Sequence, residues 1–313
     1  MPTRPTPESH AQSRRRLLLA TLGVAALLAA CQTPPPMVAV KPTEPLPVVK
    51  PVVPPRPPRI GLALGGGAAR GFAHIGVIQV LEEAGIKPQL VVGTSAGSLV
   101  AALYASGKSG NELANLAQGM DESALTDWSF PGRGLIKGEL LAKYVRAQTG
   151  GLNIEQTKMP LGIVATDLAD GEPILFQRGD IGAAVRASSA VPAVFQPVRM
   201  GGREYVDGGL VSPVPVRFAR EMGAEMVIGV DISTPPNPES TGDSFHILLQ
   251  TVAIMGRSIN RWELKDADVV LRPTLAGVSS ADFTARMKAV QSGREAALAA
   301  LPALRAKIQA LTR

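Results

Sequence analysis

The stretch from Leu90 to Val100 constrains the fold of this chain more than any other. An apolar run is followed by the pentapeptide Gly-Thr-Ser-Ala-Gly (93–97) and then by a segment rich in alanine and leucine. The apolar run is typical of a buried strand, and the segment after it is typical of a helix. This order predicts a strand, a tight turn and a helix, with Ser95 at the turn. Gly93 and Gly97 would keep Cβ atoms out of the crowded turn, so that the hydroxyl of Ser95 can point outward above the sheet.

Two interpretations of this serine follow from the pattern. In one, Ser95 is a nucleophile placed at the N-terminus of a helix. In the other, the residues Gly-Thr-Ser only end a strand and cap the next helix. The pentapeptide alone does not decide between them, so the rest of the chain must.

A second glycine-rich turn precedes the first by about thirty residues. Residues 60–64 predict a buried strand, and Gly65, Gly66 and Gly67 follow it. A dinucleotide-binding turn is not favoured, because Arg70 stands where the third glycine would be and the next strand lacks the expected acidic residue. Bare backbone N–H groups at this turn could instead stabilise a developing oxyanion.

The remainder of the body alternates apolar strands with helical segments, which predicts one α/β domain over residues 59–313. Two helices flank the irregular stretch 121–137, where Trp128 and Phe130 either pack under a long loop or form a lid. Beyond the first two units, strands are expected at 161–166, 173–176, 204–207, 226–231 and 269–271. Helices are expected from 71 to 83, from 180 to 188, at 244–264 and at 282–305.

A serine nucleophile needs a base, and the chain has three histidines. His10 lies in the leader, while His74 and His246 lie near the starts of helices rather than at strand ends, so both are expected to have structural roles. Asp207 is the alternative base, because it follows a short strand and precedes Gly208 and Gly209. An Asp-Gly pair is also a common turn, and both interpretations stay open.

The N-terminal region differs from the body in charge and composition. Residues 1–58 carry seven of the 32 Lys and Arg and two of the 26 Asp and Glu, which leaves 25 basic and 24 acidic residues in a nearly neutral body. Nothing in this balance indicates a nucleic-acid partner. Cys31 is the single cysteine, which excludes an intrachain disulfide and a cysteine-based metal site.

Residues 1–30 predict a signal peptide, since three arginines precede an apolar run that is short for a membrane span. Small residues just before Cys31 resemble a bacterial lipobox, which predicts lipidation of this cysteine; an ordinary cleavage site with an incidental cysteine is the alternative. Gln32 then favours the outer membrane, with the body facing the periplasm. Residues 31–58 are rich in proline and predict an extended tether.

Three motifs in this order resemble those of the patatin-like phospholipases, closest to bacterial members. They are Gly65-x-Gly67-x-x-Arg70-Gly71, Gly93-x-Ser95-x-Gly97 and Asp207-Gly208-Gly209. The resemblance covers about residues 60–235 and includes the segment 187–197. It implies a three-layer α/β/α sandwich with a central, mostly parallel sheet. The third motif departs slightly from the family pattern, with Gly209 in place of alanine.

The resemblance also implies a chemistry. Ser95 would attack an acyl ester with Asp207 as its base, Gly65, Gly66 and Gly67 would supply oxyanion donors, and Arg70 would support that loop. No metal or cofactor is implied, and the expected partners are a phospholipid or another acyl-ester lipid and the membrane. The alternatives are a lipid-binding lipoprotein with a vestigial Ser–Asp pair, and a general carboxylesterase or thioesterase. The oligomeric state is not predicted.

Overall fold

The computed structural model describes residues 55–120, 127, 133–233, 242–279 and 282–313. Its centre is one mixed sheet with the strand order β10-β9-β1-β2-β4-β8-β7, and β5 also pairs with β4. The parallel strands are β1 (Ile60–Leu64), β2 (Leu90–Thr94), β4 (Leu161–Asp167), β9 (Met226–Val230) and β10 (Val269–Leu271). The antiparallel additions are β5 (Pro173–Phe176), β7 (Val198–Met200) and β8 (Arg203–Asp207).

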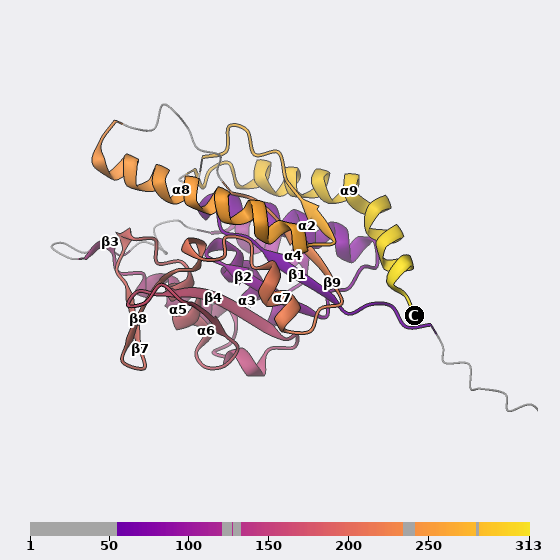
Figure 1. Cartoon of the computed structure of the whole chain (residues 1–313), viewed down its shortest axis with the longest axis horizontal. Coiled ribbons are helices and arrows are strands. Elements are labelled where there is room, and N and C mark those ends of the chain that lie inside the picture. The colour runs from indigo at the N-terminus through magenta and orange to yellow at the C-terminus, as the bar shows by residue number, and fades with distance from the viewer. Residues whose placement is uncertain (1–54, 121–126, 128–132, 234–241, 280–281) are drawn as a thin grey trace, which may run out of the picture. The chain divides into compact units, whose positions relative to one another are not determined.

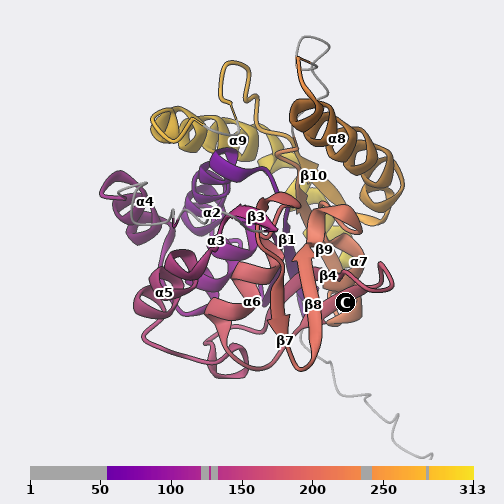
Figure 2. The same ribbon diagram turned by 90° about the vertical axis from the view of Figure 1, so that its left-hand side faces the viewer.

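Helices cover both faces of this sheet, as Figures 1 and 2 show. The larger hydrophobic cluster joins one face of the sheet to α2 (Phe72–Glu83), α3 (Ala96–Ala105), α4 (Gly110–Gln118), α5 (Glu139–Gln148), α6 (Ile181–Ser188) and α9 (Arg286–Leu311). The smaller cluster joins the other face to α7 (Val216–Glu221) and to the short helix η5 (Leu264–Asp266), which follows α8 (Ser244–Glu263). The fold is therefore the predicted three-layer α/β/α sandwich with a mostly parallel sheet.

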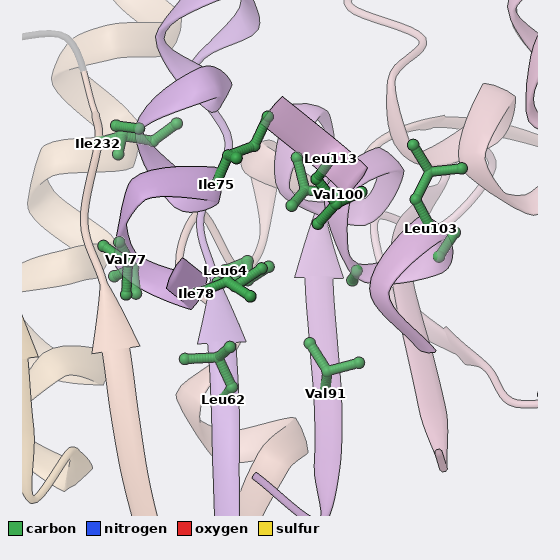
Figure 3. Packing of buried hydrophobic residues seen from close by; sticks show 14 of the residues in the cluster. Leu62, Leu64, Ile75, Val77, Ile78, Val91, Val100, Leu103, Leu113 and Ile232 are labelled. Atoms are coloured by element: carbon green, nitrogen blue, oxygen red, sulfur yellow. The ribbon is translucent and has the colours of Figure 1, made fainter. Parts of the chain in front are cut away.

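The sequence of β1 explains this layering. Leu62 and Leu64 point into the larger cluster, where they meet Ile78 of α2 and Val91 of β2 (Figure 3). Ala63, between them, points into the smaller cluster on the opposite face. Alternate residues of a strand face opposite sides of the sheet, and a parallel strand covered on both sides must be apolar throughout.

Most of the predicted elements are confirmed, with differences in the bounds of α9, the direction of one strand and the presence of short strands. The helix expected at 282–305 is α9, which begins and ends later, at Arg286 and Leu311. The expected strand 173–176 is present but antiparallel to β4. The stretch 121–137 was expected to be irregular, yet its end forms β3 (Gly134–Ile136), which pairs with β6 (Ala193–Phe195) in a separate two-stranded sheet. Trp128 and Phe130 lie outside the described residues, so their role stays a prediction.

Two glycines let α2 and α9 approach closely. A Cβ atom added to Gly293 would lie 1.9 Å from the carbonyl oxygen of Ala73, and one added to Gly76 would lie 1.9 Å from that of Val290. Both contacts are with helix backbone, which cannot rotate away as a side chain can. The contact between these two helices therefore depends on the absence of a side chain at both positions.

The substitution Gly293→Ala should separate these helices and lower stability. We expect a loss of about 3 kcal/mol, the upper part of the usual range for an overpacked site, and a fall in Tm of roughly 6–12 °C. Gly256→Ala in α8 is the matched control, because its added Cβ would meet Pro213 at an ordinary 3.5 Å. That variant should keep its stability or gain up to about 1 kcal/mol from the better helix propensity of alanine. Equal Tm values for the two variants, measured by thermal denaturation, would contradict this account of the packing.

The predicted signal peptide, Cys31 and most of the tether lie outside the described residues. Arg56, which the sequence places in the tether, pairs with the end of the chain: its N–H donates to the carbonyl oxygen of Arg313 at 2.7 Å, and its guanidinium contacts Glu225 at 2.7 Å. Within the described ranges, no helix has the length and apolar character needed to cross a membrane.

Candidate active site

Ser95 occupies a strained position between β2 and α3. Its φ of 53° and ψ of −125° lie in a region that residues with a side chain rarely adopt. The chain can turn this sharply because Gly93 and Gly97 lack side chains: a Cβ on Gly93 would lie 2.4 Å from the carbonyl oxygen of Gly97, and a Cβ on Gly97 would lie 2.1 Å from that of Leu64. The two flanking glycines thus allow the turn between strand and helix, as the sequence predicts.

Strand β4 brings Asp207 next to this turn. Its neighbouring residues Val164 and Ala165 pair with Thr94, the last residue of β2, and with Asp207, the last residue of β8. Ser95 and Asp207 are 112 positions apart in the sequence. They come together because β2 and β8 both end beside the same two residues of β4. Gly208 must be glycine here, because a Cβ on it would lie 2.3 Å from the carbonyl oxygen of Val164.

The hydroxyl of Ser95 lies beside the carboxyl of Asp207 and favours its ionised form. The carboxylate also accepts a hydrogen bond from the N–H of Gly209 at 2.7 Å. Both groups favour the ionised carboxylate, but burial outweighs them and raises the pKa of Asp207 to about 6. Ser95 and Asp207 are 8% and 6% exposed, so both lie almost completely within the protein. A carboxylate with such a pKa, beside a serine hydroxyl, can accept a proton near neutral pH.

Ser188, at the end of α6, holds the strained turn in place. Its Oγ accepts the N–H of Ser95 at 2.9 Å and donates to the carbonyl oxygen of Val164 at 2.5 Å. It therefore links the serine turn to Val164 of β4, which precedes the residue that pairs with Asp207. The sequence shows Ser188 only as part of the segment 187–197, because its partner lies 93 residues earlier in the chain.

The glycine loop, residues 65–67, lies against the serine turn, residues 93–97. A Cβ on Gly66 would lie 3.1 Å from the Cβ of Ser95. The N–H of Gly65 donates to Val230 at 3.1 Å and the N–H of Gly66 to Pro213 at 3.0 Å, so neither is free to receive an oxyanion. These bonds correct the prediction of three glycine donors: among the described residues, the N–H of Gly67 has no hydrogen-bond partner.

Arg70 and His74 stand behind this loop. Arg70 is 7% exposed, and its Nε has no partner among the described residues. Burial lowers the pKa of Arg70, although the charge of Asp231 partly offsets this. Burial likewise lowers the pKa of His74 to about 4, and its Nε2 lies 2.8 Å from the carbonyl oxygen of Gly65. A neutral His74 donating this bond fixes the start of the loop, which is a structural role.

Among the described residues, the contacts of His246 are with Asp243 and Phe245 and not with Ser95. His246 is at the exposed start of α8, where its Nδ1 contacts the capping carboxylate of Asp243 at 2.9 Å. In the part of the chain that the structure describes, no group of three or more His, Cys, Asp or Glu side chains is placed to hold a metal ion. Among the described residues, Asp207, Ser188 and Gly66 lie against Ser95.

Comparison with known proteins places this site in a family. The family model described as "Patatin-like phospholipase" matches residues 62–220, about half of the chain. The chain belongs to the patatin-like phospholipase family. The matched range contains the glycine loop, the serine turn and Asp207, so all three motifs noted in the sequence lie within it.

Individual relatives agree with this assignment. An uncharacterized NTE family protein of Mycobacterium tuberculosis is 39% identical over 179 residues, covering 56% of this chain and 49% of its own length. The human patatin-like phospholipase domain-containing protein 6 is 31% identical over 231 residues, covering 71% of this chain and 16% of its own length. The chain thus spans half or less of these curated relatives.

The fold also resembles a solved structure. VipD from Legionella pneumophila superimposes with a TM-score of 0.54 over 83% of this chain and 68% of that chain, at 15% sequence identity. At this identity the similarity concerns the fold alone.

Proposed function

We propose that this protein is a serine acyl hydrolase that cleaves acyl esters of membrane lipids, as a phospholipase A or lysophospholipase does. The observation that carries the proposal is the placement of the Ser95 hydroxyl beside the buried carboxylate of Asp207, which neighbouring residues of β4 bring together. Ser95 sits at a strained turn, and no histidine in the described residues replaces the carboxylate as its partner. Family membership supports the same class of reaction.

The proposed mechanism has two halves. Oγ of Ser95 attacks the ester carbonyl carbon while Asp207 takes the hydroxyl proton, and the tetrahedral oxyanion is stabilised by backbone N–H groups. The intermediate collapses to an acyl-serine, and the departing alcohol, a lysolipid or glycerol derivative, takes the proton from Asp207. Water then attacks the acyl-serine with Asp207 again as base, which releases the fatty acid and restores Ser95.

The oxyanion donor we favour is the N–H of Gly67. The N–H groups of the two preceding residues, Gly65 and Gly66, already donate to backbone carbonyl oxygens. Gly67 is held closely, since a Cβ on it would lie 2.9 Å from the carbonyl oxygen of Ile232. We assign Arg70 to support of this loop from behind.

The surface of α8 supports a lipid substrate. Six of the nine most exposed large apolar side chains among the described residues lie on this helix: Phe245, Ile247, Leu248, Ile254, Met255 and Trp262. Exposed apolar side chains concentrated on one helix are typical of proteins that act at lipid surfaces. We further propose that lipidated Cys31 and the proline-rich tether hold the body at the outer membrane, facing the periplasm.

The test is release of fatty acid by the full-length protein. We expect hydrolysis of phospholipid or lysophospholipid vesicles at rates above those for a soluble p-nitrophenyl ester and for an acyl thioester. Faster turnover of the thioester or the soluble ester would assign the protein to those classes instead. Absence of turnover on every substrate, in protein that binds vesicles, would favour a lipid-binding role and contradict the proposal.

The pH dependence of this turnover reports on Asp207. Burial raises its pKa from the usual 3.8 to about 6. Because only the ionised form can accept the serine proton, kcat/KM should rise with pH, reach half of its maximum near pH 6 and level off above about pH 7. A profile that rises only above pH 8, or one that is flat from pH 4 to pH 8, would contradict Asp207 as the base.

A further inference from the structure

A cavity of about 270 Å³ lies between α8 and the segments that follow β9 and β10, outside the groups assigned to the proposed reaction. One wall is α8, which contributes Arg257, Asn260 and Arg261. The other wall follows the ends of β9 and β10 and contributes Asp231 and Arg272. Figure 2 shows α8 passing beside β10 and β9. The three α8 residues are three and four positions apart, which places them on one face of the helix.

Asn260 indicates that the cavity is built for a ligand. It is only 4% exposed, and neither its amide nitrogen nor its amide oxygen has a hydrogen-bond partner among the described residues. A buried amide without partners costs free energy of folding, so native structures rarely keep one without a reason. A polar ligand in the cavity would supply the missing partner.

The charges around Asn260 indicate the sign of that ligand. Three arginines line the cavity against one carboxylate, Asp231. That carboxylate is already engaged, because Ser233 donates to it through both its hydroxyl, at 2.6 Å, and its N–H, at 3.1 Å, and Arg272 lies 3.5 Å away. Arg257 and Arg261 have no ion pair within the described ranges. The cavity therefore carries excess positive charge and free guanidinium donors.

We propose that this cavity binds a phosphoryl group, with Arg257, Arg261 and the amide of Asn260 as its donors. Guanidinium groups match the geometry of phosphate oxygens and can bind them through paired hydrogen bonds. The amide nitrogen of Asn260 adds a neutral donor for a phosphate oxygen.

The position of the cavity favours the phosphate of a lipid headgroup over free phosphate. Ile232, beside Asp231, contacts Gly67 of the loop, and Gly256 of α8 packs near Pro213, which accepts the N–H of Gly66. The same helix exposes the apolar side chains noted above. The cavity thus adjoins both the proposed oxyanion loop and the apolar surface of α8. This choice of source rests on the proposed function, whereas the binding of phosphate does not.

The first arm of the test measures binding without turnover. Inorganic phosphate and glycerophosphocholine are titrated by calorimetry into the full-length Ser95→Ala protein. We expect saturable binding of at least one of them, about tenfold weaker or worse after Arg257→Gln or Arg261→Gln, because each removes a charged hydrogen bond. Arg305→Gln on α9, an exposed arginine outside the cavity, is the charge-matched control and should bind as Ser95→Ala does.

Asn260→Leu provides a second, independent signature. Removing an unpartnered buried amide should raise Tm in the absence of ligand, while phosphate binding weakens. A purely structural asparagine would instead lower Tm when replaced. No saturable binding of either probe, or variants that bind both probes as strongly as the control, would overturn the proposal.

The second arm identifies the source of the phosphate. The three variants Arg257→Gln, Arg261→Gln and Arg305→Gln are made in protein that keeps Ser95. For each, kcat/KM is measured for monomeric dihexanoylphosphatidylcholine and for dihexanoylglycerol, and the ratio of the two values is compared between variants. A fall of about tenfold in the first two alone would assign the cavity to the lipid headgroup. An unchanged ratio together with lost phosphate binding would overturn that assignment and identify free phosphate as the ligand. If the proposed function is wrong, the binding measurements can still be interpreted, because they use an inactive protein.

Discussion

Ser95→Ala is expected to lower the rate of lipid ester hydrolysis by about 1,000-fold or more, because no neighbouring group can form the acyl intermediate in its place. The fold should survive, since alanine keeps the Cβ and the Ser95 backbone bonds to Ser188 and Ser98. The measurement is fatty acid release from phospholipid vesicles by the full-length protein. Ser106→Ala, at the far end of α3, is the control and should retain wild-type activity within about twofold. Equal rates for Ser95→Ala and wild type would exclude Ser95 as the nucleophile.

The strain at Ser95 offers a check on the same residue. Its φ of 53° is a conformation that glycine adopts at no steric cost. Ser95→Gly should therefore be inactive and yet more stable than Ser95→Ala, by about 1–3 kcal/mol if the turn holds the strain. Thermal denaturation of the two variants measures this difference. A lower Tm for the glycine variant would mean that the backbone at Ser95 is not strained.

Asp207→Asn is expected to lower kcat by about 100- to 10,000-fold, the usual contribution of a general base. The amide is nearly the same shape as the carboxylate, and its oxygen can still accept the N–H of Gly209. The variant should therefore still fold, and the fall in kcat reports on the reaction. The measurement is kcat in parallel with Tm, and wild-type turnover by Asp207→Asn would show that another group takes the proton.

The stability of this variant should also depend on pH in a set direction. The pKa of Asp207 is raised from 3.8 to about 6 in the folded protein, so folding favours its protonated form. Below about pH 4 the carboxyl is protonated in both states and costs nothing; as pH rises through about 6, the buried charge comes to cost about 3 kcal/mol. Asp207→Asn should accordingly exceed wild type in Tm at pH 8 and lose that advantage near pH 4. A variant less stable than wild type at pH 8 would contradict burial as the cause of the raised pKa.

The core of the fold follows from local sequence patterns. Strands such as Leu90–Thr94 and Leu161–Asp167 are continuous apolar runs that end in glycine or polar residues, so their type and place can be predicted. The strands β3, β6 and β7 have three residues each and show no periodicity. β3 and β6 form because distant segments pair, as Phe195 does with Ile136, and a sequence pattern contains no record of that pairing. β7 instead pairs with the adjacent strand β8.

The candidate site also contains residues that the sequence predicts and contacts that it does not. Ser95 and Asp207 are visible in the sequence because glycines mark the turns that carry them. The hydrogen bonds of the loop amides cannot be predicted from the sequence, because the partners of Gly65 and Gly66 are Val230 and Pro213, far along the chain. Ser188 is hidden for the same reason. The spacing of Arg257, Asn260 and Arg261 is legible as one face of a helix, but only the packing of α8 beside β9 and β10 encloses a cavity there.

The central claim is that Ser95 forms the covalent acyl intermediate with Asp207 as its base. A fluorophosphonate probe that mimics the acyl transfer, followed by peptide mapping with mass spectrometry, tests this claim directly in the full-length protein. We expect one probe per chain on the peptide that contains Ser95, much slower labelling of Asp207→Asn, and no labelling of Ser95→Ala. Labelling of another residue, or equal labelling of Ser95→Ala and wild type, would contradict the account.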